Sequence, residues 1–295
     1  VTFDGATYSS RVVNGILFGC EQATVALGFP VLGEAEHINR AVVTTADVTG
    51  LDTGFSFNAI TNTADSAATY SFNSAGSWST FDAGANGVGV DPDGYKGVVF
   101  DGRYAYFPPN NNRAARHGEV LRYDTTAAFS AAGSWTAFDP GTAGVGVDPD
   151  GFRGGIYDGR YVYFVPHDNG TSNHGEVLRY DTTGSFTAAG SWATFDAGAN
   201  GVGTDPDGFD GAVFDGRYAY FVPRYDGAAP NGEVLRYDTT ATFNAAASWS
   251  SFDPGANGVG IDPDGYDGAL FDGKYIYFAP DDNGTSVHGE VLRYD

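Results

Sequence analysis

A chain of 295 residues with 42% hydrophobic and 15% aromatic residues is large enough to bury a core, so its 43 glycines indicate turns rather than a disordered, low-complexity chain. The 37 acidic and 15 basic residues give a formal net charge of −22, which repels phosphate backbones and excludes nucleic acid as an expected partner. No apolar run approaches the roughly 20 residues that cross a bilayer, so we expect no membrane insertion. The lone cysteine, Cys20, excludes an internal disulfide.

The first 82 residues match the rest of the chain only loosely. The opening triplet Thr2-Phe3-Asp4 returns as Thr80-Phe81-Asp82 and as Thr194-Phe195-Asp196. Residues 5–82 therefore read as a diverged copy of the later sequence, with an insertion at about 46–68. Within this insertion, residues 54–60 alternate apolar and polar side chains, which predicts an exposed strand. This strand either packs on its own unit as a surface loop or adds to a neighbouring molecule.

Four copies of a 57-residue repeat fill the remainder. The segment Gly-Glu-Val-Leu-Arg-Tyr-Asp marks each copy and starts at Gly118, Gly175, Gly232 and Gly289. Each copy has four short runs rich in Val, Tyr, Phe and Trp between Gly, Pro and Asp, which is typical of antiparallel strands. Asp158-Gly159 predicts a tight hairpin between two of them. In this copy the predicted strands are 154–157, 161–166, 176–181 and 192–195.

A four-stranded unit repeated at this length resembles the blade of a β-propeller, which is an all-β fold. We expect one domain, 1–295, with five blades, because the chain then begins on an outer strand and stops just before one, which closes the ring without a free edge. The alternative is a four-bladed ring of residues 67–295 with residues 1–66 as an arm. The five-bladed prediction assigns 1–4 as the closing strand of the last blade, 5–82 as the first blade, 83–139, 140–196 and 197–253 as regular blades, and 254–295 as the last blade.

The segment Asp-Pro-Asp-Gly precedes the first strand of every copy. Asp, Pro and Gly suit the first, second and last positions of a tight turn, so a turn is expected. Two aspartates one residue apart also resemble the opening of a calcium loop, although the other ligands of an EF-hand are missing. Calcium is thus a hypothesis, and no other cofactor is expected. The candidate metal ligands are Asp91, Asp93, Asp148, Asp150, Asp205, Asp207, Asp262 and Asp264.

An aromatic residue follows each of these turns, and a histidine precedes the third strand in three of the four copies. Both positions precede strands that run in the same direction, so we expect them on one face, where they form a candidate binding site for a sugar or a metal. Asn231 replaces the histidine once, which fits a hydrogen-bonding role in a loop better than a catalytic one. The candidate ligand-binding residues are Tyr95, Phe152, Phe209, Tyr266, His117, His174 and His288.

Two further patterns recur. Asn169 and Asn283 begin Asn-Gly-Thr, the acceptor pattern for N-glycosylation, in equivalent loops. An arginine lies on each third strand, for which we expect an exposed cross-strand partner such as a carboxylate, with a phosphate or carboxylate receptor as the alternative. These arginines are Arg122, Arg179, Arg236 and Arg293.

No catalytic residues are predicted. Propeller enzymes such as five-bladed glycoside hydrolases gather different carboxylates from different blades, whereas these copies present the same residues. Only the diverged residues offer an asymmetric set, namely Glu21, Glu34, Glu36 and His37.

Near-identical blades suit two non-catalytic functions. Several weak, equivalent sites gain avidity for a repeated ligand, and the architecture resembles that of tachylectin-like lectins, which implies glycans as partners. A structural unit needs no pocket, and a head-to-tail contact that does not close generates a filament. We expect an extracellular or cell-surface structural protein that self-assembles into a fibre, sheath or surface layer. A multivalent lectin is the first alternative and a glycoside hydrolase-type enzyme the second.

Overall fold

The structure is a computed structural model that describes residues 2–3, 6–7, 11–13, 16–18 and 73–295. It divides into two compact units, Val1–Thr80 and Phe81–Asp295. In the first unit, β1 (Thr2–Phe3) pairs antiparallel with β2 (Ala6–Thr7), β3 (Arg11–Val13) pairs antiparallel with β4 (Ile16–Phe18), and the 3-10 helix η2 spans Ala75–Ser77. Most of the predicted first blade, its insertion at 46–68, Cys20 and the diverged Glu21, Glu34, Glu36 and His37 lie outside the described residues.

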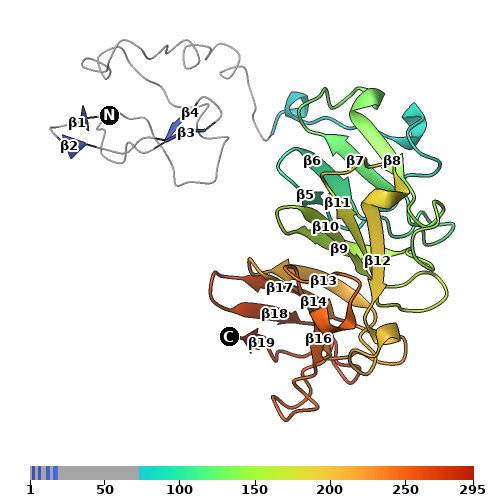
Figure 1. Cartoon of the computed structure of the whole chain (residues 1–295), viewed down its shortest axis with the longest axis vertical. Helices are drawn as coiled ribbons and strands as arrows, with labels where there is room; N and C mark the ends of the chain where they lie inside the picture. Colours follow the sequence, from blue (N-terminus) through green and yellow to red (C-terminus); the bar gives the residue numbers. More distant parts are fainter. Residues whose placement is uncertain (1, 4–5, 8–10, 14–15, 19–72) are drawn as a thin grey trace. The chain divides into compact units, whose positions relative to one another are not determined.

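The second unit consists of four successive antiparallel sheets, one for each copy of the repeat (Figure 1). The first contains β5 (Val99–Phe100), β6 (Tyr104–Phe107), β7 (Val120–Asp124) and β8 (Trp135–Phe138). The second contains β9 (Phe152–Tyr157), β10 (Tyr161–Pro166), β11 (Glu176–Asp181) and β12 (Trp192–Asp196). The third contains β13 (Phe209–Phe214), β14 (Tyr218–Pro223), β15 (Val234–Asp238) and β16 (Trp249–Phe252). The fourth contains β17 (Tyr266–Phe271), β18 (Ile276–Pro280) and β19 (Leu292–Tyr294).

The predicted all-β fold with one antiparallel sheet per repeat is confirmed, and helical structure in the second unit is limited to short 3-10 turns. These turns are η3 (Gly84–Asn86), η4 (Ala132–Ser134), η5 (Ala189–Ser191), η6 (Gly198–Asn200) and η7 (Ala246–Ser248). None of the helices among the described residues has the length and apolar character needed to span a bilayer.

The sheets follow one another through their first strands. Strand β9 packs beside β5 and β13, and β13 packs beside β17. This is how successive blades of a propeller meet, so the arrangement is compatible with that fold. No closed ring is present among the described residues, and the choice between five and four blades stays a prediction.

The hydrophobic core lies in the seams between neighbouring sheets and is largely aromatic. Between the first two sheets, Tyr106 packs against Tyr180 and Phe186, with ring centroids 5.8 and 6.2 Å apart. Trp192 packs on Tyr180 at 4.6 Å and donates a hydrogen bond from Nε1 to the carbonyl oxygen of Phe186 at 2.8 Å. Burial of each such side chain contributes about 1.5–3 kcal/mol. Since each seam needs side chains from two sheets, no sheet completes its core alone.

Hairpins close the opposite ends of the sheets. The loop between β9 and β10 spans residues 158–160 and contains the predicted Asp158-Gly159 pair. Gly159 has a φ of 104°, which glycine adopts without steric cost. Asp158 caps the loop, because its Oδ1 accepts hydrogen bonds from the N–H groups of Arg160 and Tyr161 at 2.8 and 2.7 Å.

Candidate functional site

The Asp-Pro-Asp-Gly segments form turns that the third strand of the same sheet fixes in place. In the second copy the N–H of Asp150 donates to the carbonyl oxygen of Asp148 at 2.9 Å, which closes a three-residue turn. Glu176, which starts β11 and is 8% exposed, accepts hydrogen bonds from the N–H groups of Val147 and Asp148 at 2.9 and 3.0 Å. The same two bonds recur in the other copies, to Glu119, Glu233 and Glu290. These glutamates recur in the sequence beside an invariant glycine, which is the signal that would have identified them.

The glycine of each turn is required by a close backbone contact with the loop that follows the second strand of its own copy. Gly151 has a φ of 68°, and a Cβ atom there would lie 1.8 Å from the carbonyl oxygen of Asp168. Its N–H donates to the carbonyl oxygen of His117 in the preceding sheet, and its carbonyl oxygen accepts from the N–H of Asp168, both at 3.2 Å. The turn therefore connects two neighbouring sheets.

The aromatic residues that we expected to face a ligand lie in the core. Phe152, Phe209 and Tyr266 begin β9, β13 and β17, and each is 0% exposed. Phe152, for example, packs on Phe164 with ring centroids 6.0 Å apart. Tyr95 is half-buried. Because burial of these rings stabilises the seams, the three fully buried ones present no face on which a sugar can stack.

The histidine position serves the same turn. His174 Nε2 lies 2.9 Å from the carbonyl oxygen of Asp150. In the third copy, Asn231 donates from Nδ2 to the carbonyl oxygen of Asp207 at 3.4 Å. Two chemically different side chains thus bond the equivalent carbonyl group, which assigns a structural task to this position.

His117 and His288 pack edge-on against the aromatic residues of their own copies, Tyr95 and Tyr266, with ring centroids 5.8 Å apart in both cases. Both ring nitrogens of His117 are buried and have no hydrogen-bond partner among the described residues. Desolvation by burial lowers the pKa of His117 and of His174. These rings are therefore neutral at pH 7.

The repeated arginines of the third strands all contact aromatic rings, and Arg293 also pairs with the carboxylate of Asp295 at 3.2 Å. The guanidinium carbon of Arg179 lies 4.2 Å from the ring centroid of Tyr161 in its own sheet and 4.1 Å from that of Phe243, contributed by the third copy. Arg122 makes the same two contacts one copy earlier. This placement uses the planar guanidinium as a stacking surface.

Carboxylates gather beside each Asp-Pro-Asp-Gly turn. Burial, followed by the charges of Asp196 and Asp205, raises the pKa of Asp207 to about 7. Burial and neighbouring acidic groups raise the pKa of Asp150 and of Asp264 to about 6. In the part of the chain that the structure describes, no three metal-ligating side chains come together as a metal site, so calcium stays a hypothesis.

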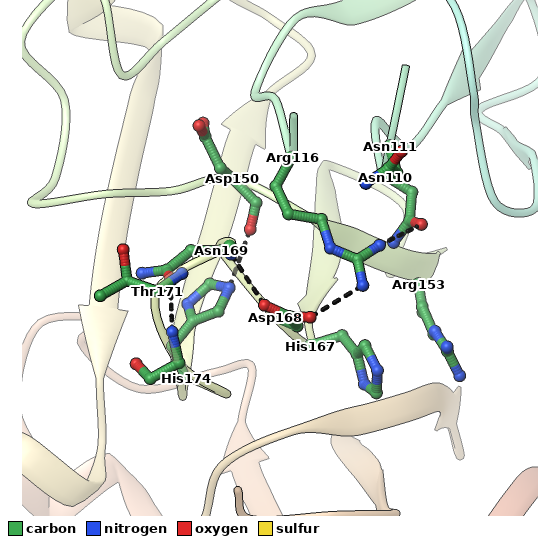
Figure 2. A network of polar contacts seen from close by, with 12 residues as sticks. Asn110, Asn111, Arg116, Asp150, Arg153, His167, Asp168, Asn169, Thr171 and His174 are labelled. Atoms are coloured by element: carbon green, nitrogen blue, oxygen red, sulfur yellow. Dashed lines mark hydrogen bonds and ion pairs between the residues drawn. The ribbon is translucent and has the colours of Figure 1, made fainter. Parts of the chain in front are cut away.

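The predicted glycosylation residues occupy equivalent positions in the loops after β10 and β18. Asn169 Oδ1 accepts hydrogen bonds from the N–H groups of Thr171 and Ser172 at 2.9 and 3.0 Å (Figure 2). Asn283 Oδ1 accepts the same pair from Thr285 and Ser286. Each asparagine thus shapes its own loop, and glycosylation stays a prediction.

The charges that differ between copies occupy a small set of positions, which we call the variable positions. One is the residue after the aromatic residue at the start of the first strand, and the others lie in the loop between the second and third strands. Outside them, each charged residue keeps its sign in every copy. A column-by-column comparison of the copies would have revealed them. The variable positions are 96, 153, 210 and 267, with the loops 110–116, 167–173, 224–230 and 281–287.

Ion pairs between variable positions connect neighbouring sheets. Figure 2 shows Arg116 pairing with Asp168 at 2.8 Å and donating a second hydrogen bond to Asn110 at 2.8 Å. In each pair that crosses a seam, the arginine belongs to one copy and the aspartate to the next. The other two such pairs are Arg153 with Asp210, at 2.7 Å, and Arg224 with Asp281. Arg224 also lies 3.8 Å from Asp210 of its own copy.

The first residue of the variable loop makes a further contact across each of the first two seams. Asn110 donates from Nδ2 to the carbonyl oxygen of Phe152 at 2.9 Å, and His167 Nδ1 lies 3.1 Å from the carbonyl oxygen of Phe209. Burial, and then the nearby charge of Arg153, lowers the pKa of His167 to about 4. The neutral ring donates this hydrogen bond in its Nδ1-protonated form.

The variable positions change from basic to acidic along the chain. Those of the first copy include Lys96, Arg113 and Arg116, here called the basic group, and no acidic residue. Those of the fourth copy include Asp267, Asp281 and Asp282, here called the acidic group, and no basic residue. The second and third copies contain both signs. The two groups therefore lie on the first and the last of the four successive sheets.

Arg113 is the unusual member of the basic group. Its φ of 76° makes it the sole non-glycine residue with a positive φ in the described part of the chain. The equivalent residues are glycines with φ values of 91°, 102° and 85°, namely Gly170, Gly227 and Gly284. The left-handed conformation costs a non-glycine residue about 1–2 kcal/mol. Arg113 is also exposed, and its side chain makes no hydrogen bond or ion pair with a described residue.

A comparison with protein-family models gave no match, and a search of curated proteins gave none either. Among solved structures, the chain is similar to one titled "Crystal structure of the computationally designed Ika4 protein", with 7% sequence identity and a TM-score of 0.40. The match covers 70% of this chain and 94% of the designed one. At this TM-score the likeness carries no statement on fold or function.

Proposed function

We propose that the protein is a non-catalytic, extracellular structural subunit that self-assembles into a fibre, sheath or surface layer. The observation that carries this proposal is that the repeated polar side chains make hydrogen bonds and ring contacts within the fold. Glu176 accepts backbone hydrogen bonds, His174 bonds a backbone carbonyl group, and Arg179 lies between two rings. Catalysis requires an acid, a base or a nucleophile that is free to reach a substrate, and these groups are already engaged in the fold.

The distribution of the remaining charges supports an assembling subunit over a lectin. A multivalent lectin needs equivalent sites in each copy, whereas the variable positions differ in every copy. The repeated aromatic residues that would stack on a sugar are buried, as in the case of Phe152 and Phe209. Opposite charges at the two ends of a row of sheets suit a heterologous contact, which builds filaments when it does not close.

Negative-stain electron microscopy of the native chain, with and without a calcium chelator, tests the proposal. Regular fibres or sheets are expected. Their loss on chelation would assign calcium to the aspartate turns, which include Asp148, Asp150, Asp205 and Asp207. Single particles of constant size in both conditions, up to high protein concentration, would contradict self-assembly and make a glycan array the next experiment.

A further inference from the structure

We infer that the basic group of one molecule binds the acidic group of a second copy of this chain, with Arg113 and Asp282 at the centre of the contact. This inference rests on the proposed self-assembly and names the surface that carries it.

The first argument is that both groups retain charges that no described residue neutralises. Lys96 and Arg113 are exposed and form no ion pair with a described residue. At the other end, Asp281 pairs with Arg224, whereas Asp282 has no basic partner among the described residues and accepts only the N–H of Gly284, at 2.8 Å. Each end of the row of sheets therefore offers a charge of the sign that the other end lacks.

The second argument is the pattern of pairing inside the molecule. All three seams between described sheets are bridged by an arginine and an aspartate at variable positions, and the arginine always comes from the earlier copy. The fourth copy has no basic residue at these positions, so it cannot supply the arginine of a further pair. The first copy has no acidic residue at these positions, so it cannot supply the aspartate of one. Opposite charges at variable positions thus recur at every seam between described sheets, and Lys96, Arg113 and Asp282 are members of the two end groups that form no such pair with a described residue.

The third argument is the backbone conformation of Arg113. Glycine occupies this position in the other three copies, where it adopts a positive φ without steric cost. A strained, exposed arginine that pairs with no described residue is not explained by stability. Backbone strain of this kind persists where the residue is needed for function. Binding to a second molecule is the function that we assign to Arg113.

The net charge of −22 opposes association at long range, so the contact must act locally. At physiological ionic strength the screening length is about 8 Å, which weakens repulsion between distant surfaces more than attraction between touching ion pairs. Because the contact joins different surfaces of the two molecules, a bound pair leaves one basic group on one molecule and one acidic group on the other open for further copies.

Sedimentation velocity on the full chain tests this contact through charge reversal. Arg113→Glu and Asp282→Lys each place like charges across the contact, so each variant alone should associate about tenfold more weakly than the native protein or stay monomeric. An equimolar mixture of the two variants, or the double variant, restores opposite charges at the Arg113–Asp282 contact and should recover association. Arg113→Gly should also associate more weakly, although it carries the residue found in the other copies.

Lys274→Glu is the matched control. It changes the net charge by the same amount as Arg113→Glu. Lys274 lies in the hairpin between β17 and β18, at the end of these strands that is remote from Asp282, so the association of this variant should equal that of the native protein. Circular dichroism confirms that each variant is folded.

Three results would overturn the inference. If the native protein assembles and both reversed variants assemble equally well, self-assembly stands but this contact is wrong. If Arg113→Glu fails to assemble while Asp282→Lys assembles normally, the partner of Arg113 is not the acidic group. A native protein that remains monomeric removes both this contact and the proposed function.

Discussion

Glu176 accepts a hydrogen bond at 3.0 Å from the backbone N–H of Asp148, a residue 28 positions earlier in the chain. With the parallel bond from Val147, this carboxylate fixes the irregular segment that enters the second sheet. Charge-assisted hydrogen bonds to backbone N–H groups are shorter and stronger than neutral ones. The repeat therefore uses a buried acidic residue as a structural anchor.

Glu176→Ala should lower the free energy of unfolding by about 2–3 kcal/mol, because two backbone donors lose a charged acceptor. Urea denaturation followed by tryptophan fluorescence measures this change. Glu290→Ala is the control, since Glu290 makes the same two bonds from a more exposed position and should cost less. Equal losses for the two variants would show that burial of Glu176 contributes nothing.

The sheets were predictable because their signals are local. The strand predicted at 176–181 matches β11 in full, and the one predicted at 161–166 matches β10. The role of Glu176 was not predictable in the same way, since its acceptor function depends on a segment far away in the sequence. The burial of Phe152 was missed for a related reason: an aromatic residue beside a turn suits a binding face and a seam equally well until the neighbouring sheet is in place.

The pKa of Asp207, raised to about 7 by burial and then by Asp196 and Asp205, predicts a pH-dependent stability. A carboxyl group whose pKa is higher in the folded protein than in the unfolded chain, where it is near 3.8, binds protons preferentially in the folded state. Its contribution to the free energy of unfolding thus falls as pH rises from about 4 to about 7. Asp207→Asn should be more stable than the native protein at pH 7.5, by on the order of 1–2 kcal/mol after solvent screening, and the difference should vanish near pH 4.

Thermal unfolding of Asp207→Asn and the native protein across pH 4–8 measures this difference. The buried His167, whose lowered pKa has the opposite effect on stability in this range, is present in both proteins and cancels in the comparison. A constant difference at all pH values would contradict the raised pKa.

Asp181 should behave in the opposite way. Although partial burial alone would raise it, hydrogen bonds from Arg160 and Thr183 lower the pKa of Asp181 to about 2. Its stabilising contribution is complete above the unfolded pKa and is lost as pH falls toward about 2. Asp181→Asn should be less stable than the native protein at pH 7.5 by about 0.5–1 kcal/mol, and the two melting temperatures should converge in acid. Melting curves that stay apart at pH 2 would indicate that the lost pair is not the cause.

Arg179→Lys tests the stacking of the guanidinium between Tyr161 and Phe243. An ammonium group keeps the charge but loses the planar surface, so we expect a loss of about 0.5–2 kcal/mol in the free energy of unfolding. Arg293→Lys should cost less, because Arg293 contacts a single ring, that of Tyr275, at 4.3 Å. Chemical denaturation measures the free energy of unfolding of both variants. A larger loss for Arg293→Lys than for Arg179→Lys would exclude ring stacking as the source of the stabilisation.

The charges at the variable positions can be predicted from the sequence, but their pairing cannot. Their chemistry is visible in the sequence, since Lys96, Arg153, Asp210 and Asp267 occupy one column of the repeat. Their pairing is not, because the ion pair between Arg153 and Asp210 requires two successive sheets to place both side chains at one seam. The residues that are the same in every copy build the sheets and turns, whereas the variable positions give each sheet its own surface charge.

The backbone strain at Arg113 leads to a reciprocal pair of stability predictions. Arg113→Gly should raise the free energy of unfolding by about 1 kcal/mol, because glycine adopts the left-handed conformation without the Cβ clash. Gly227→Arg, at the equivalent residue of the third copy, should lower it by a similar amount, because an added Cβ atom there meets only ordinary contacts at 3.7 Å. Arg113→Ala removes the charge but keeps the Cβ atom, so its stability should equal that of the native protein. If Arg113→Ala stabilises as much as Arg113→Gly, the cost lies in the arginine side chain and not in the backbone, and the strain that links Arg113 to a binding function does not exist.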